Sequence, residues 1–148
     1  KTLEEILKIY DVPSYLQKRA KDKIFDLNAS YAKVFGCNKV PSVDQTKFVF
    51  VNDNDSIEIA NFTIKVLYTP GHTDDSVCYI IDNFFFSGDT LFKNSVGRTD
   101  LITGNTFKLG QSLVKIKNLK QDYIIYPGHD GTTSLSSEKK NNPYLKNN

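Results

Sequence analysis

The chain has 148 residues, of which 39% are hydrophobic, 12% aromatic and 24% charged. This length and composition fit one globular domain and exclude a highly charged disordered chain, and no apolar run reaches the roughly 18 residues of a membrane-spanning helix. Nineteen Lys and Arg residues against seventeen Asp and Glu residues leave a net charge of +2. Because the lysines are scattered, the charge favours neither a nucleic acid nor a membrane as partner.

The N-terminal part of the chain combines short predicted elements with irregular segments. Apolar residues at helical spacing predict a helix over residues 2–10, and Val12-Pro13 ends it because proline disfavours the helical conformation of the residue before it. A short strand is expected over Ser14 to Leu16, and a second helix over Gln17 to Ile24.

From Lys47 onward the pattern becomes that of strands. Segments rich in β-branched and aromatic residues alternate with Asn and Asp turns, which is typical of a sheet. The last of them is apolar at consecutive positions and therefore predicts a strand covered on both faces. The segments are Phe48–Val51, Ser56–Ala60, Phe62–Tyr68, Val77–Ile81 and Phe84–Phe86.

The C-terminal part of the chain adds helices to the predicted sheet. Apolar residues at the spacing of one helix face predict an amphipathic helix over residues 106–119. A short buried strand is expected over Tyr123 to Tyr126, and a last helix over Ser136 to Asn142. The combination indicates a layered α/β fold, and we expect a single domain over residues 1–148.

The two cysteines, Cys37 and Cys78, lie far apart and lack the CxxC spacing of zinc ribbons and redox motifs. We therefore interpret both as free thiols. Free thiols favour a reducing compartment, and the cytoplasm is the expected location.

The strongest chemical signal is the position of the only two histidines, because His72 and His129 both follow a Pro-Gly pair at the end of an apolar run. Asp89 follows a third such run. Loops at strand ends display side chains at a sheet edge, and imidazole and carboxylate groups suit zinc, iron or manganese. The three residues are distant in sequence, so any site is assembled by the tertiary fold. Taken singly, each residue has a structural alternative, with the histidines hydrogen-bonded in turns and Asp89 closing a loop.

Five motifs resemble the C-terminal motifs of metallo-β-lactamase-fold hydrolases, and most closely those of the glyoxalase II-like (hydroxyacylglutathione hydrolase-like) branch. Their order and spacing agree with that family over residues 60–145. The resemblance implies an αββα sandwich that is incomplete in this chain. The motifs are Thr69-Pro70-Gly71-His72-Thr73, Ser87-Gly88-Asp89-Thr90-Leu91-Phe92, Ser95-Val96-Gly97-Arg98-Thr99-Asp100-Leu101, Tyr126-Pro127-Gly128-His129, and Glu138-Lys139 with Asn142-Pro143-Tyr144-Leu145.

The resemblance also implies roles for individual residues. His72 would bind a first metal ion and His129 a second, while Asp89 would bridge both ions and hold the catalytic hydroxide. The ions would be zinc, or else iron or manganese. Arg98 would lie near the substrate mouth, although a surface salt bridge is an equally good interpretation of that arginine.

One family motif, His-x-His-x-Asp-His, has no counterpart here, because the chain has only the two histidines already named. We therefore expect the chain to lack the N-terminal strands and the first metal motif. The intact parent would be a metal-dependent hydrolase acting on a thioester or a related small-molecule acyl substrate, and this chain alone would be inactive. The alternative is a non-catalytic, degenerate binding or interaction module. Codons immediately before Lys1 would separate the two hypotheses.

A sandwich without these strands would expose a sheet edge and an apolar face. We expect either a homodimer formed through that edge or a covering segment outside the chain.

Overall fold

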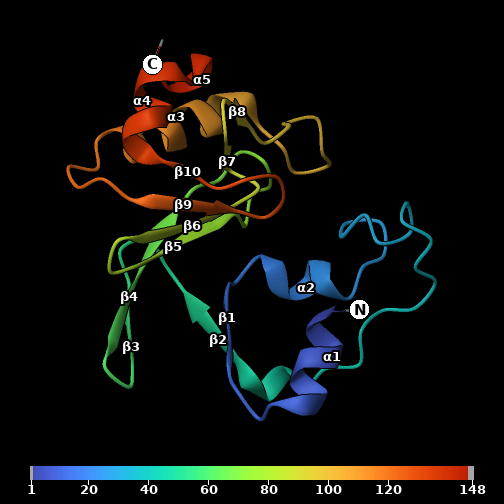
Figure 1. Cartoon of the computed structure of the whole chain (residues 1–148). Coiled ribbons are helices and arrows are strands. Elements are labelled where there is room, and N and C mark those ends of the chain that lie inside the picture. Colours follow the sequence, from blue (N-terminus) through green and yellow to red (C-terminus); the bar gives the residue numbers. More distant parts are fainter. Residues whose placement is uncertain (1, 147–148) are drawn as a thin grey trace. The chain divides into compact units, whose positions relative to one another are not determined.

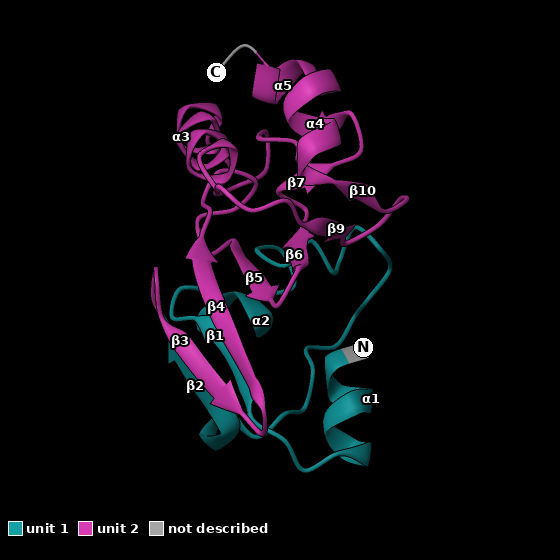
Figure 2. Ribbon diagram, turned by 60° about the vertical axis from the view of Figure 1, so that its left-hand side comes forward, with its two compact units in different colours: residues 1–51 teal, residues 52–148 magenta. Residues whose placement is uncertain are grey.

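The computed structural model describes residues 2–146, and the contacts between residues divide the chain into two units with the boundary between Val51 and Asn52 (Figures 1 and 2). The expectation that both units belong to one domain over residues 1–148 stays a prediction. Among the described residues, no helix is long and apolar enough to cross a bilayer.

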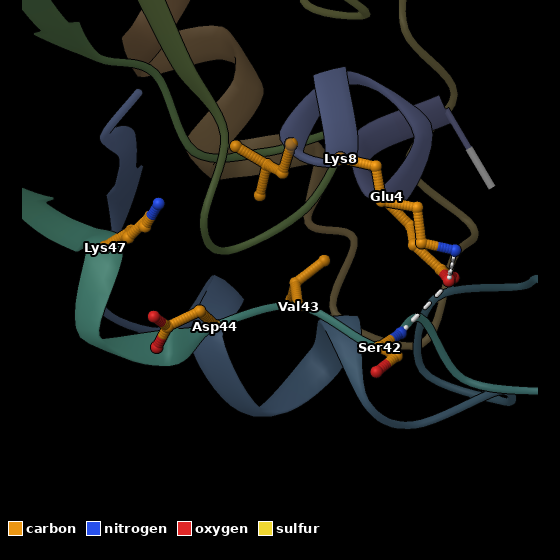
Figure 3. Close-up of a pocket in the computed structure, with 7 residues that line it drawn as sticks. Glu4, Lys8, Ser42, Val43, Asp44 and Lys47 are labelled. Carbon is orange, nitrogen blue, oxygen red and sulfur yellow. Dashed lines mark hydrogen bonds and ion pairs between the residues drawn. The ribbon is translucent and has the colours of Figure 1, made fainter. Parts of the chain in front are cut away.

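The first unit is built from short elements around a two-stranded parallel sheet, in which Ser14 lies opposite Phe48. The predicted second helix begins later than expected, because residues 18–19 form a turn. A shallow pocket lies beside the first helix, where Glu4 accepts hydrogen bonds from Lys8 Nζ (2.6 Å) and from the main-chain N–H of Ser42 (3.3 Å) (Figure 3). The elements are α1 (Thr2–Ile9), β1 (Ser14–Gln17), α2 (Ala20–Ile24), a 3₁₀ turn (Gln45–Lys47) and β2 (Phe48–Val51).

The second unit contains a six-stranded sheet with the strand order β10-β9-β6-β5-β4-β3. Neighbouring strands are antiparallel, except that β6 and β9 run parallel. The edge strands are β3 and β10, and dimerisation through an edge stays a prediction. The strands are β3 (Ser56–Ile59), β4 (Phe62–Tyr68), β5 (Val77–Ile81), β6 (Phe84–Gly88), β9 (Ile124–Pro127) and β10 (Thr133–Ser134).

Three helices pack on one face of this sheet: α3 (Thr106–Lys117), α4 (Leu135–Asn141) and α5 (Pro143–Lys146) (Figure 1). Polar caps begin the first two, since Asn105 accepts from the Lys108 N–H and Ser134 from the Ser137 N–H. The helices and the sheet share one apolar core. Its buried members are Leu67, Cys78, Ile80, Phe85, Leu91, Leu109, Leu113, Ile116, Ile125, Leu135 and Leu145.

Burial along β6 corrects one expectation. Phe85 is 1% exposed and packs in the core, whereas Phe86 is 40% exposed. Side chains alternate between the two faces of a strand, and only the face toward the helices is buried here. The prediction of cover on both faces is therefore wrong.

A small hairpin that follows β6 and precedes α3 in the sequence was not predicted. It consists of β7 (Leu91–Phe92) and β8 (Ser95–Val96), joined by a turn in which Asn94 has a left-handed φ of 57°. Strands of two residues are too short for a periodic pattern, so the sequence offers no signal for them.

Candidate metal centre

Strand directions bring the three predicted site residues to one edge of the sheet. His72 follows the end of β4, Asp89 the end of β6 and His129 the end of β9. Both β4 and β6 are antiparallel to β5, and β9 is parallel to β6, so the three strands end at the same edge. Side chains that are far apart in the sequence therefore meet in one place.

The Asp89 carboxylate lies between the two imidazoles. Its Oδ2 is 3.6 Å from His72 Nε2, and its Oδ1 is 4.0 Å from His129 Nε2. Two donors bound at about 2.0–2.2 Å to one tetrahedral ion lie roughly 3.3–3.6 Å apart. Each imidazole and its facing oxygen are thus spaced to share an ion after little or no movement, with the carboxylate common to both ions.

Neither His–Asp89 pair has, among the described residues, a third His, Cys, Asp or Glu side chain placed to bind the same ion. Within residues 2–146, no three His, Cys, Asp or Glu side chains are grouped so that they could hold one ion. In the described geometry one carboxylate faces two imidazoles, and each imidazole with its facing oxygen is a candidate half-site.

Hydrogen bonds orient both imidazoles with Nε2 toward Asp89. His72 Nδ1 lies 2.9 Å from the main-chain carbonyl oxygen of Arg98, which can only accept, so Nδ1 carries the proton. His129 Nδ1 lies 3.0 Å from a carboxylate oxygen of Asp130, which favours the same tautomer. Both arrangements leave the Nε2 lone pair available to a metal.

Two glycines allow the site to be this crowded. A Cβ atom at Gly97 would overlap the main-chain oxygen of Asp89 and lie 3.1 Å from His72 Cβ, and one at Gly128 would overlap Asp89 Oδ1. The Pro-Gly pair before His129 thus has a steric reason beyond turn formation. The role of Gly97 had no signal in the sequence, because a close approach across space leaves no local pattern.

Thr69, Cys78 and Thr90 form a buried cluster that includes two hydroxyls and a thiol. Thr69 Oγ1 lies 3.2 Å from Cys78 Sγ and 3.3 Å from Thr90 Oγ1. Burial raises the pKa of the Cys78 thiol to about 11, so the free thiol stays protonated at neutral pH. Cys37 is also free, as expected for both cysteines.

The main-chain carbonyl of Arg98 orients His72, whereas its guanidinium pairs with Asp100. The guanidinium donates to both oxygens of Asp100, at 2.6 Å each, and this hydrogen bonding holds the pKa of the exposed Asp100 carboxyl at about 2. The surface salt bridge, one of the two interpretations of this arginine, is therefore present, and a position near a substrate mouth stays a prediction. The sequence could not reveal that its carbonyl orients His72, since every residue has a carbonyl.

An aromatic contact of His129 was also not predicted from the sequence. The Phe92 ring stacks on the His129 imidazole with a centroid distance of 4.4 Å and an interplanar angle of 29°. Phe92 lies in β7, and the two residues are distant in sequence, so only the fold brings them together.

Comparisons with known proteins agree with this fold. The model of the metallo-beta-lactamase superfamily matches residues 3–129. The "Probable metallo-hydrolase YqgX" of Bacillus subtilis is 30% identical over 149 residues, covering 97% of this chain and 68% of that protein. A hydroxyacylglutathione hydrolase of Francisella philomiragia is 39% identical over 84 residues, covering 55% of this chain and 33% of that enzyme.

Solved structures give the same result. The BLEG-1 B3 metallo-beta-lactamase superposes with a TM-score of 0.86 at 30% identity, covering 97% of this chain and 69% of that one. TTHA1623 in a di-iron-bound form superposes with a TM-score of 0.79 at 27% identity, covering 95% and 69%.

The chain spans only part of the curated relatives it matches, for example 45% of a Mycobacterium leprae protein and 66% of one from Aquifex aeolicus. The names of several relatives indicate hydrolase activity. The expected resemblance and the expected mixed α/β fold are confirmed. The family model, the similarity to a probable metallo-hydrolase over 97% of this chain and the common fold establish that this chain belongs to the metallo-beta-lactamase superfamily.

Proposed function

We propose that this chain supplies part of a dinuclear metal centre to a hydrolase. His72 binds one ion, His129 binds the other, and Asp89 bridges them. The observation that carries the proposal is the position of Asp89, whose two oxygens face the Nε2 atoms of different imidazoles at 3.6 and 4.0 Å. Nitrogen and oxygen donors suit zinc, iron and manganese, and a structural neighbour is described as di-iron-bound.

The number of ligand atoms that this chain offers to each ion indicates that a complete metal centre needs further ligands. Each ion receives one imidazole nitrogen and one oxygen of the shared carboxylate, whereas catalytic zinc sites have about three protein ligands. We expect the isolated chain to bind metal weakly and to hydrolyse no acyl substrate. The complete protein would add the remaining donors and the activity.

The residues of this chain have distinct tasks in that reaction. Bound ions would lower the pKa of water to about 7 and polarise a substrate carbonyl. Asp89 offsets part of the charge of two cations with one carboxylate. The Arg98 carbonyl and the Asp130 carboxylate accept hydrogen bonds from the two Nδ1 atoms, which fixes the ring orientations and leaves each Nε2 facing Asp89.

The substrate class we favour is an acyl thioester. The support is the similarity to a hydroxyacylglutathione hydrolase, which is 39% identical over a segment that covers 55% of this chain. A negative result with a hydroxyacylglutathione, together with hydrolysis of another acyl compound by the complete protein, would reject the thioester and keep the hydrolase.

A zinc titration of the chain tests the metal centre directly. The chain contains only two histidines, so selective isotope labelling of histidine gives one set of imidazole signals for each half-site. Zn²⁺ should shift both sets, and Asp89→Asn should weaken both responses by about tenfold or more, because it changes the shared ligand. Asp75→Asn serves as a control outside the three ligands. Unshifted imidazoles in the wild-type chain would reject the proposal.

A further inference from the structure

A carboxylate outside the metal centre is fully buried without a cation beside it. Glu138 in α4 is 0% exposed, and in the described part of the chain it makes no ion pair. Its oxygens instead accept three hydrogen bonds from uncharged donors. Thr133 Oγ1 donates to Oε1 at 2.6 Å, and the Asn94 N–H and Asn142 Nδ2 each donate to Oε2 at 2.8 Å.

A buried carboxylate is costly unless hydrogen bonds satisfy it, so these donors are held firmly. They belong to separate segments of the chain. Asn94 forms the turn of the β7–β8 hairpin, and Thr133 begins β10, which follows the loop that carries His129. One carboxylate therefore fastens the hairpin and the end of the His129 loop to the same helix.

Asn142, also fully buried, extends this fastening to the residue that contacts the imidazole. Its Nδ2 donates to the carbonyl oxygens of Phe92 at 3.3 Å and Ser95 at 3.0 Å, on the two strands of the hairpin. The Phe92 ring in turn stacks on the His129 imidazole. The connection from the buried carboxylate to the imidazole thus runs through contacts that all lie in the second unit.

We propose that Glu138 is a positioning residue for the His129 half-site. It holds the Phe92 ring and the end of the His129 loop in one geometry, so that Nε2 of His129 faces Asp89. The metal-binding part of this inference rests on the proposed function. His72 is held by a separate contact, with the carbonyl of Arg98, which lies three residues beyond the Ser95 that Asn142 binds, so the effect on His72 should be weaker than that on His129.

A purely structural role for Glu138 makes a different prediction from a positioning role. Loss of a structural anchor loosens the unit as a whole and affects both half-sites. Loss of a positioning contact affects His129 much more than His72. The two histidines are therefore each other's internal control.

The variants follow from the hydrogen bonds. Glu138→Ala removes all three acceptor interactions, and Thr133→Val removes one donor while keeping the side-chain shape. Glu138→Gln is the conservative rescue, because its oxygen can accept from Asn94 and Asn142, and the Thr133 hydroxyl can rotate to accept from its amide. Ser112→Ala is the reciprocal control, since Ser112 Oγ donates to the Pro70 carbonyl in the His72 loop at 2.7 Å.

The first measurement is a Zn²⁺ titration of the histidine-labelled chain. We expect the apparent affinity at His129 to fall about tenfold in Glu138→Ala and about threefold in Thr133→Val, with His72 changed less than about twofold. Glu138→Gln should restore the wild-type response, and Ser112→Ala should weaken His72 instead. An equal loss at both histidines, or no loss at His129 in the folded variants, would overturn the proposal.

A second measurement needs no metal. The Phe92 ring shifts the imidazole signals of His129 through its ring current, and we expect this shift to decrease in Thr133→Val and Glu138→Ala and to persist in Glu138→Gln. If Glu138→Ala does not fold, the comparison of Thr133→Val with wild type decides. If the imidazole signals of the wild-type chain do not shift with Zn²⁺, the metal centre is rejected. If the ring-current shift is unchanged in Thr133→Val, only the positioning role of Glu138 is rejected.

Discussion

The two histidine loops share a Pro-Gly-His sequence but are held by different kinds of contact. The His72 side chain is 18% exposed, and its Nδ1 atom donates to a main-chain carbonyl. The His129 side chain is 63% exposed, and its Nδ1 atom faces the side chain of its neighbour Asp130. Backbone contacts in a buried setting are rigid, whereas exposed side-chain contacts compete with water. Single substitutions around the His72 loop should therefore lower the free energy of unfolding more than those in the His129 loop.

The substitution Gly97→Ala should have the largest effect on the His72 side. The added methyl group would overlap the main-chain oxygen of Asp89, and backbone must move to make room. We expect the free energy of unfolding to fall by about 1–3 kcal/mol in urea denaturation. Gly110→Ala in α3 is the matched control, since nothing lies within 4 Å of its added Cβ and it should stabilise the helix by about 0.5–1 kcal/mol. Equal stability of Gly97→Ala and wild type would contradict the close approach.

Alkaline pH should weaken the buried cluster around Cys78. The pKa of Cys78 is raised from its ordinary 9.0 to about 11 by burial, so the folded state binds this proton more tightly than the unfolded chain does. The stability from the protonated thiol is present below pH 9 and is lost as the pH rises toward 11. The loss should reach about 2–3 kcal/mol, measured as the free energy of unfolding.

Two variants isolate the contribution of this thiol. Cys78→Ala should flatten the dependence of unfolding free energy on pH between 9 and 11, whereas Cys37→Ala, at a half-buried free thiol in the first unit, should keep the wild-type slope. Identical slopes in both variants would show that other groups cause the loss.

A smaller effect is expected from Ser112→Ala. The variant removes the hydrogen bond from Ser112 Oγ to the Pro70 carbonyl, which lies two residues before His72. We expect a loss of about 1 kcal/mol of unfolding free energy, because a typical intramolecular hydrogen bond contributes that amount. Thermal denaturation of the variant beside Ser56→Ala, at an exposed serine of β3, would measure it, and an equal change in both would contradict the prediction.

The smallest effect should come from Asp130→Asn on the His129 side. Asp130 is exposed, and the amide oxygen of the variant can still accept from His129 Nδ1. We expect the free energy of unfolding to change by less than about 0.5 kcal/mol. A loss of more than about 1 kcal/mol of unfolding free energy would mean that the His129 loop is held as firmly as the His72 loop, and it would contradict the difference between the two loops.

Much of this arrangement could be predicted from local sequence. Alternating and β-branched segments marked β2 to β5, and the Pro-Gly pairs marked the loops that carry His72 and His129. The pairing of distant segments was not available from local patterns. For that reason the hairpin, the contact of Phe92 with His129 and the use of the Arg98 carbonyl became visible only in three dimensions. The exposed Phe86 shows the limit of a short apolar run, which does not distinguish one covered face from two.

The parallel pairing of β6 with β9 has a consequence for folding kinetics. Phe84 pairs with Ile124 only after the intervening hairpin and α3 have been bridged, and such long-range contacts form slowly. We expect this pairing, which brings Asp89 and His129 together, to form late, so that a metal ion finds no assembled half-site there early in folding. Binding should consequently slow the unfolding rate while leaving the refolding rate nearly unchanged.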